Sequence, residues 1–447
     1  MSCICADCVQ DHYLKRLIEQ TASEANPCEY CESLAGIELW DLAWLCDEVI
    51  SRYYELTSNS KAVVVYDRDP EGDNLHDTIL KLTGIPTDAV EVVVDDLSFI
   101  WFDRDSGESR YGEDDPWFSR RSLADSLGHA WQEMEESLRS ADFLFDAHAL
   151  LGTIFNDLTN DRDSTGSEVI IQAGPAGSLK TLYRGRTFQT DEELAKALRH
   201  PEKSLGPPPA GKGSAGRMNR LGQQAFYGAT DAGICVAEVR PPVGSRVALV
   251  EFEVTRPLRL LDMQRLSKIE LATDASLFDP ATTAAVERRD FLRTLTERLS
   301  APIVPDLQDR DYLVTQAVAD YLASHPGLCL DGIVYPSAQS RFPGAAPVGH
   351  NVVLFENACQ VNGASGDKPT AEVTLWEYEE DGPGRYFRPE IHFLERNVGG
   401  QEDLAFRGSL RLRRESIVVR EITAIRYDYN PTDVAAVAST DDWIFRG

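Results

Sequence analysis

The chain has 447 residues, which is too long for one ordinary hydrophobic core, so we expect two or three domains. Hydrophobic residues make up 43% and charged residues 26% of the sequence, a balance that predicts a folded protein. The formal net charge is −29, which argues against a nucleic-acid partner because phosphate backbones repel an acidic surface. A few arginines focused in one cleft can still bind an anionic small molecule.

The sequence also bears on the compartment in which the protein works. No stretch reaches the roughly 18 uncharged apolar residues of a membrane span, and no basic-then-apolar secretory signal begins the chain. Nine cysteines are present, five of them within the first 31 residues, and this odd, uneven set does not fit a secreted disulfide framework. We therefore expect a cytoplasmic protein without a membrane partner.

Hydrophobic periodicity predicts that residues 1–160 form a mostly helical first domain. Helices are predicted over 36–56, 76–82 and 119–138, where apolar residues recur at helical spacing. The apolar runs KAVVVY (61–66) and AVEVVV (89–94) are predicted as strands. A polar break at 160–167 ends this domain.

Residues 165–362 predict a strand-rich second domain with short turns. The predicted strands are 182–184, 225–228, 234–239, 246–254, 258–261, 331–337 and 351–355. A Pro/Gly-rich loop or hinge at 203–216 and a helical block at 266–325 interrupt them, with the clearest helices at 284–299 and 312–322. Residues 366–447 alternate apolar and polar residues, which predicts a small β-rich appendage.

Two CxxC pairs near the amino terminus form a candidate metal site. The pairs are Cys5 with Cys8 and Cys28 with Cys31. Two such pairs can surround one Zn²⁺ ion with four thiolates, and four protein ligands leave no open position, so the site would be structural. Two alternatives stay open: four unrelated buried cysteines, or a zinc site in which Cys3 or His12 replaces one ligand.

The second domain places polar residues where a strand-rich domain would otherwise bury apolar ones. These candidate site residues are Arg184, Arg186, Arg217, Tyr227, Glu238 and Ser337. Arginine pairs bidentately with phosphate, and tyrosine offers a flat face to an aromatic base. A carboxylate can stabilise positive charge that develops on a sugar, and a serine hydroxyl can bind a ribose hydroxyl. The set therefore suits a ligand with phosphates and a ribose, although each residue taken alone is more often structural.

The order and spacing of these residues resemble the RES domain, a family of NAD⁺-consuming phosphorylases and ADP-ribosyltransferases. The matching motifs are YRGR (183–186), GRMN (216–219), Tyr227 with Glu238 eleven residues later, Thr315-Gln316 before DGIVYPS (331–337), and the closing strand 351–355. The intervals from Arg184 to Arg217 and from Glu238 to Ser337 are longer than the family's, which indicates insertions between motifs. The cysteine pairs and the helix GIELWDLAWLCDEV resemble, less specifically, the HEPN/RES amino-terminal domain.

The resemblance implies an α+β protein: a helical amino-terminal domain with a zinc knuckle, then a split β core with a helical insertion. The β core would resemble diphtheria-toxin-like ADP-ribosyltransferases, with NAD⁺ as the substrate in its cleft. The resemblance implies that Glu238, Arg184 and Ser337 are catalytic. It also implies that Arg184, Arg186, Arg217, Tyr227 and Ser337 bind NAD⁺. Many members of the family are toxins that a separate antitoxin blocks.

Three functions stay open. The first is an NAD⁺ phosphorylase or glycohydrolase that passes ADP-ribose to inorganic phosphate or water and depletes NAD⁺ as a toxin or defence effector. The second is a protein ADP-ribosyltransferase, and the third is a catalytically silent sensor of NAD⁺ or ADP-ribose. The intact set of site residues favours an enzyme. An antitoxin or regulatory protein and a homodimer stay open as partners.

Glu238 is the residue on which we expect cleavage to depend. In the predicted strand 234–239 its side chain would share a face with Val236 and Arg240, on a rigid element beside the sugar. The structural alternative is a salt bridge between Glu238 and Arg240, two residues apart on that face.

Overall fold

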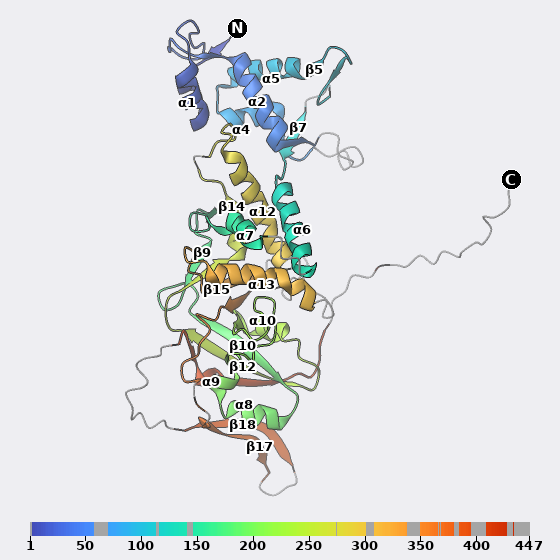
Figure 1. The fold of residues 1–447 in the computed structure, drawn as a ribbon, viewed down its shortest axis with the longest axis vertical. Coiled ribbons are helices and arrows are strands. Elements are labelled where there is room, and N and C mark those ends of the chain that lie inside the picture. Colours follow the sequence, from blue (N-terminus) through green and yellow to red (C-terminus); the bar gives the residue numbers. More distant parts are fainter. Residues whose placement is uncertain are drawn as a thin grey trace, which may run out of the picture.

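The computed structural model shows a mixed α+β fold, as the sequence predicts. It describes residues 2–57, 70–112, 116–140, 146–273, 275–300, 308–337, 349–364, 366, 368–379, 384–394, 408–426 and 432. Figure 1 shows three levels along the longest axis: the amino-terminal helices, a group of longer helices, and a large sheet. Within the described ranges, no helix is both long and apolar enough to cross a membrane.

The amino-terminal elements enclose an apolar core of their own. They are β1 (Cys3–Ile4), η1 (Ala6–Cys8), α1 (His12–Thr21), β2 (Ile37–Glu38), α2 (Leu39–Tyr53), β3 (Tyr54–Leu56), β4 (Asp73–Asn74), α4 (Leu75–Thr83), α5 (Thr87–Trp101), β5 (Phe102–Asp103), β6 (Glu108–Ser109) and β7 (Trp117–Arg120). The Asp11 side chain caps α1, and α4 ends at Gly84, whose φ of +63° suits glycine. Helices α2 and α4 confirm the helices predicted over 36–56 and 76–82.

The strand predicted over 89–94 is wrong, because this segment lies inside helix α5. Ala89, Val93, Leu97 and Trp101 recur every four residues and are all buried, on the side of α5 that packs against α2. The β-branched valines favour a strand locally, but burial of one helical face outweighs that weak preference. The strand predicted over 61–66 lies outside the described residues.

A second group of helices forms the middle level, around a second core. They are α6 (Asp125–Ser140), α7 (Ala147–Phe155), α12 (Thr282–Ser300) and α13 (Gln308–Ser324). Helix α6 begins at Asp125, and Ser119, where the sequence placed the helix start, lies in β7. Trp131 of α6 packs on Phe291 of α12, with 5.4 Å between ring centroids. Helices α6 and α7 therefore share a core with the helical block at 266–325, whereas the sequence assigned them to the first domain. The domain limits stay predictions.

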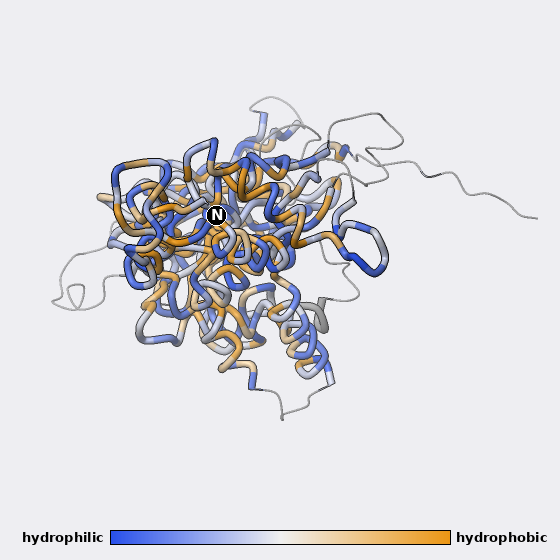
Figure 2. The backbone as a smooth tube through the Cα atoms, turned by 90° about the horizontal axis from the view of Figure 1, so that it is seen from above, coloured by the Kyte–Doolittle hydropathy of each residue, from blue (hydrophilic) through white to orange (hydrophobic). Residues whose placement is uncertain are grey.

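Helix α12 connects the two cores. Val286, near its start, is buried in the amino-terminal core, whereas Phe291 and Leu299 are buried in the second core. The Tyr53 hydroxyl lies 2.9 Å from the Thr283 hydroxyl and joins α2 to the same end of α12. A helix of 19 residues is about 28 Å long, so one rigid element spans both cores. Figure 2, seen along the longest axis, shows apolar segments in orange mainly inside the molecule.

A mixed sheet of nine strands forms the third level. Its strand order is β19-β12-β10-β11-β16-β15-β13-β9, with β20 also paired to β12. The strands are β9 (Ile170–Ala173), β10 (Thr181–Phe188), β11 (Phe226–Ala229), β12 (Arg246–Val254), β13 (Leu258–Asp262), β15 (Gly332–Pro336), β16 (His350–Leu354), β19 (Leu410–Leu412) and β20 (Val418–Glu421). Only β13 and β15 pair in parallel among them. Most strands predicted for the second domain are confirmed within one or two residues.

The sheet is accompanied by shorter elements. They are α8 (Asp191–Leu198), α9 (Pro201–Ser204), α10 (Ala232–Glu238), α11 (Met263–Leu266), β8 (Arg162–Asp163) and β14 (Ile269–Glu270). Helix α9 takes up the first residues of the loop predicted at 203–216.

The predicted carboxy-terminal appendage is only partly separate from this sheet. Strands β17 (Ala371–Tyr378) and β18 (Arg385–Phe393) form a hairpin of their own, at the lower end of Figure 1. Strands β19 and β20, however, pair with β12 of the main sheet. The alternating pattern at 409–425 predicted strands correctly, but such a pattern does not say which strand is the partner.

Candidate functional site

A cavity of about 430 Å³ brings together four of the six predicted site residues. Arg184, Arg217, Tyr227 and Glu238 line it, although they come from β10, the turn at 216–219, β11 and the end of α10. Ser337 follows β15 and hydrogen-bonds to Glu238. The fold therefore gathers residues that lie up to 153 positions apart, counted from residue 184 to 337.

The segment around Glu238 is a helix, and the strand predicted over 234–239 is wrong. The Asp231 side chain accepts hydrogen bonds from the backbone N–H groups of Gly233 and Ile234, which caps the start of α10. Ile234 and Cys235 then bury one side of this short helix. Glu238 is its last residue, so the end of a capped helix holds the carboxylate.

Two side chains hold the Glu238 carboxylate by one oxygen. The Ser337 hydroxyl donates to Oε1 at 2.5 Å, and the Asn351 amide Nδ2 donates to the same atom at 2.8 Å. Ser337 and Asn351 are both buried, at the end of β15 and in β16, which are paired neighbours. Oε2 has no hydrogen-bond partner among the described residues, so one carboxylate oxygen is fixed and the other is available to a ligand. The salt bridge to Arg240 is not formed between these described side chains.

Arg184 is a cation fixed in the wall of the cavity. Its Nη1 donates to the Tyr227 carbonyl at 2.6 Å, and its guanidinium lies 5.2 Å from the centre of the Phe226 ring. Burial disfavours the charged form and lowers the pKa of Arg184 to about 10, so the side chain keeps its charge at neutral pH. The cavity thus has a permanent positive charge at this wall.

Tyr227 anchors the turn that carries Arg217. Its hydroxyl donates to Asn219 Oδ1 at 2.8 Å and accepts from the Met218 backbone N–H at 2.9 Å. Burial raises the pKa of Tyr227, so the phenol stays protonated and remains a donor. The turn also approaches the ring closely, since a Cβ atom on Gly216 would lie 2.7 Å from the hydroxyl oxygen. Glycine is therefore required at the start of the GRMN motif.

Helix α13 holds the other side of the same turn. The Gln316 amide donates to the carbonyls of Gly216 and Asn219, at 2.8 and 3.0 Å. The Thr315 hydroxyl donates to the Arg217 carbonyl. These contacts give the Thr315-Gln316 pair a structural role, because they fix the backbone from which the Arg217 side chain projects.

The side chain of Arg217 reaches the end of α12. Its Nη1 donates to the Leu299 carbonyl at 2.5 Å, and its guanidinium lies 5.9 Å from the centre of the Tyr312 ring. Arg186 lies elsewhere: it donates to the Ser204 carbonyl at 2.7 Å and lines a separate cavity with Glu193. Of the two arginines in the YRGR motif, only Arg184 borders the cavity that contains Glu238.

Several lining residues were not among the site residues predicted from the sequence: Ser214, Cys235, Arg240, Tyr312, Tyr335 and Asn351. Tyr335 and Asn351 lie within motifs that were noted, but their side-chain roles depend on the pairing of β15 with β16. Burial raises the pKa of Cys235 to about 11, so this thiol is neutral at neutral pH.

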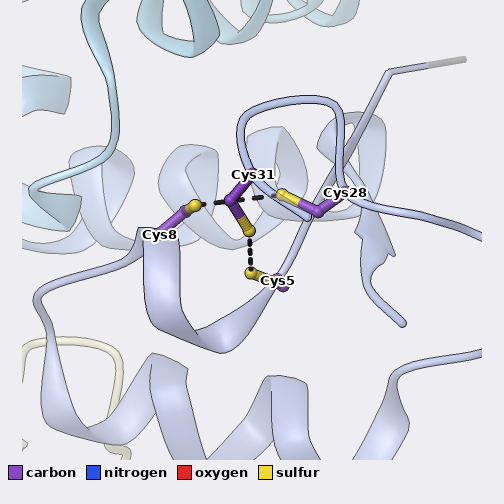
Figure 3. A group of neighbouring side chains, drawn as sticks. All are labelled: Cys5, Cys8, Cys28 and Cys31. Atoms are coloured by element: carbon purple, nitrogen blue, oxygen red, sulfur yellow. Dashed lines mark hydrogen bonds between the residues drawn. The ribbon is translucent and has the colours of Figure 1, made fainter. Parts of the chain in front are cut away.

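The four paired cysteines also come together, in the amino-terminal core. Figure 3 shows their side chains converging from η1 and from the loop after α1. All four Sγ atoms lie within 4.8 Å of one another, and Cys8 and Cys28 are 3.8 Å apart. Sulfur ligands at 2.3 Å around a tetrahedral Zn²⁺ lie about 3.8 Å apart. Cys8 and Cys28 have this separation, whereas Cys5 and Cys31 are 3.3 Å apart, so the group could close around such an ion after a small adjustment. Neither Cys3 nor His12 belongs to the group.

One backbone N–H group also points at this cluster. The Ser33 N–H lies 3.5 Å from Cys31 Sγ, and backbone donors of this kind stabilise a thiolate ligand. The structure therefore contains a four-cysteine group that could hold a metal ion.

The cavity and the surrounding strands belong to a known type of domain. Residues 181–376 match the RES domain, from the start of β10 into β17. This part of the chain is therefore a RES domain, a family linked to NAD⁺-related toxin activity, as the motifs predicted. No curated protein and no solved structure matches the chain.

The anchoring role of Tyr227 gives a first prediction. Tyr227→Phe removes a hydroxyl with two hydrogen bonds and leaves the Met218 N–H and Asn219 Oδ1 without it, so the free energy of unfolding should fall by about 1–3 kcal/mol. Urea denaturation measures this change. The control is Tyr378→Phe, at a tyrosine that is 70% exposed, where we expect a change within about 0.5 kcal/mol. Equal stability of the two variants would contradict the anchoring role.

Proposed function

We propose that this protein cleaves the nicotinamide–ribose bond of NAD⁺ and passes ADP-ribose to inorganic phosphate or water. One observation carries the proposal: Arg184, Arg217, Tyr227 and Glu238 line a single cavity, and Ser337 holds Glu238. These residues match the RES motifs in order. The proposal thus rests on both the family match and the convergence of its polar residues.

The charges of the cavity suit a dinucleotide with a pyrophosphate. Arg184, Arg217 and Arg240 line it together with one carboxylate, Glu238, although the whole chain has a net charge of −29. A local cluster of cations in an acidic protein concentrates the electric field where an anion would bind. Arginine also offers planar donor pairs that match phosphate oxygens.

Aromatic rings border the same space. Tyr227, Tyr312 and Tyr335 line the cavity, and Tyr335 is buried. Their faces suit stacking with the nicotinamide or adenine ring. Adjacent cationic and aromatic walls are what a ligand with both phosphates and bases requires.

In the proposed reaction the bond between the nicotinamide nitrogen and ribose C1′ breaks, and its electron pair goes to the nicotinamide. The positive charge of the pyridinium ring is thereby lost, and positive charge develops on the ribose. Oε2 of Glu238 is available to stabilise that charge, while Ser337 and Asn351 fix Oε1. Such stabilisation is stronger in the transition state than in the ground state, so it raises the rate. An oxygen of phosphate or water then bonds to C1′.

Two other functions could use the same site. A protein acceptor would make the chain an ADP-ribosyltransferase, and binding without cleavage would make it a sensor of NAD⁺ or ADP-ribose. Incubation with NAD⁺ and phosphate, followed by mass spectrometry of the products, separates the three. The family further supports a role as a toxin or defence effector that depletes NAD⁺ and is restrained by an antitoxin or regulatory protein.

We also propose that Cys5, Cys8, Cys28 and Cys31 bind one Zn²⁺ ion. The ion would be structural, since four thiolates complete a tetrahedron and leave no position for a substrate. These cysteines connect β1, η1 and the loop before β2, where little other regular structure holds the chain. A metal would therefore cross-link this corner of the amino-terminal core.

The first test concerns Glu238. Glu238→Gln keeps the size of the side chain but removes its charge, so turnover of NAD⁺ should fall about a hundredfold or more while NAD⁺ binding is largely retained. Nicotinamide release and calorimetric titration measure the two effects. Glu192→Gln, at an exposed glutamate of α8, should leave both unchanged. Wild-type turnover in folded Glu238→Gln would refute the assignment.

Arg217 and Arg186 give a paired test, because they line different cavities. Arg217→Ala removes a guanidinium from the cavity and should weaken NAD⁺ binding about tenfold or more. Arg186→Ala removes one from the separate cavity and should leave the dissociation constant nearly unchanged. If Arg186→Ala instead abolishes binding, the sequence-based assignment of Arg186 to NAD⁺ is correct and the cavity described above is not the whole site.

The metal proposal predicts one zinc per chain in the purified protein, measured by elemental analysis. Cys8→Ser should lower the zinc content and destabilise the amino-terminal core, because structural zinc contributes directly to folding. Cys329→Ser, at an exposed cysteine outside the cluster, should keep the full zinc content. Zinc-free wild-type protein with four free thiols in the cluster would exclude the site.

A further inference from the structure

The cavity contains a third arginine, Arg240, which makes no side-chain contact of this kind with the described residues. Arg184 and Arg217 each donate to a backbone carbonyl and lie over an aromatic ring. Arg240 also lines the cavity and is exposed, but its guanidinium has neither a hydrogen bond nor an ion pair with any described residue. In a chain with 73 acidic and 44 basic residues, carboxylates are plentiful, yet none of the described ones pairs with this guanidinium at the cavity.

The backbone at Arg240 is also held in an unusual conformation. Its φ is +43°, in the left-handed region that non-glycine residues rarely adopt. Pro241 follows directly and restricts the conformations of Arg240 further. The Arg240 N–H donates to the Ala237 carbonyl at 3.2 Å, which ties the residue to the end of α10. Strained residues of this kind concentrate at functional sites, where the strain serves to place a side chain.

Arg240 follows Glu238 by two residues in the chain, and both side chains line the cavity. Glu238 is the group that would face the ribose carbon at which the bond breaks. A cation attached to the same helix end is therefore suited to an anion near the reacting carbon. Arg184 and Arg217 come from other walls, on β10 and on the turn at 216–219.

We propose that Arg240 binds the acceptor, inorganic phosphate, beside Glu238. This inference rests on the proposed cleavage of NAD⁺ and assigns the acceptor to a residue. A phosphate oxygen bonds to ribose C1′, the electron pair of the broken bond leaves with nicotinamide, and the proton of hydrogen phosphate passes to solvent. The products are nicotinamide and ADP-ribose with a phosphate ester at C1′.

The test compares Arg240→Gln and Arg240→Lys with the wild type at several phosphate concentrations. Consumed NAD⁺, ADP-ribose and its phosphate ester are quantified by mass spectrometry. Arg240→Gln should raise the KM for phosphate about tenfold or more, shift the products toward ADP-ribose, and leave the KM for NAD⁺ within about twofold. Arg240→Lys keeps the charge and should recover part of the phosphate ester. Arg52→Gln, at an exposed arginine of α2, is the matched control and should change neither constant.

A second measurement keeps the inference testable without turnover. Binding of inorganic phosphate to the full chain, followed by ³¹P nuclear magnetic resonance, should be present in the wild type and lost in Arg240→Gln. Arg240→Gly replaces Arg240→Gln if that variant fails to fold, because glycine accepts the positive φ.

The outcomes separate this inference from the proposed function. A raised KM for NAD⁺ with an unchanged KM for phosphate would place Arg240 on the pyrophosphate of NAD⁺ and overturn the inference. Turnover with unchanged products in Arg240→Gln would overturn it as well. Absence of NAD⁺ cleavage in the wild type would refute the proposed function, and phosphate binding that depends on Arg240 would still establish the anion site.

Discussion

The carboxylate of Glu238 joins the elements on which the cavity depends. Through Oε1 it accepts from Ser337 after β15 and from Asn351 in β16, so the end of α10 is tied to two paired strands. A buried hydroxyl and a buried amide both need a partner, and the carboxylate of Glu238 accepts from both. The same contact that satisfies these groups also orients the carboxylate. The structural role of Glu238 and the chemical role that we propose for it thus coincide in one side chain.

The turn at 216–219 is likewise held by residues from several elements. Tyr227 from β11 and Gln316 from α13 hold it from opposite sides, and the Arg217 side chain extends from it to α12. Three elements that are distant in sequence thereby fix one guanidinium. Fixing it in advance lowers the entropy lost when a ligand binds. The long interval between Glu238 and Ser337 contains α12 and α13, which supply two of these contacts.

The sequence predicted which residues form the site better than it predicted how they are arranged. Spacing identified the four cysteines and the residues Arg184, Arg217, Tyr227 and Glu238, because ligand chemistry restricts residue type. It placed Glu238 on a strand, since a short apolar run does not distinguish a buried strand from a buried helix. The same ambiguity affected α5. The roles of Asn351 and Arg240 depend on strand pairing and on one backbone angle, and neither is encoded in local spacing.

Helix α12 links the cavity to the amino-terminal core. Val286 belongs to the core that contains the cysteine group, and the Leu299 carbonyl at the other end receives the hydrogen bond of Arg217. A fragment limited to the RES domain would uncover Val286 and lose α6 and α7 from the second core. Both the cavity and the cysteine-bearing core depend on α12 being folded. If a ligand in the cavity stabilises the helix, it also stabilises the cysteine-bearing core, and the core stabilises ligand binding by the same free energy.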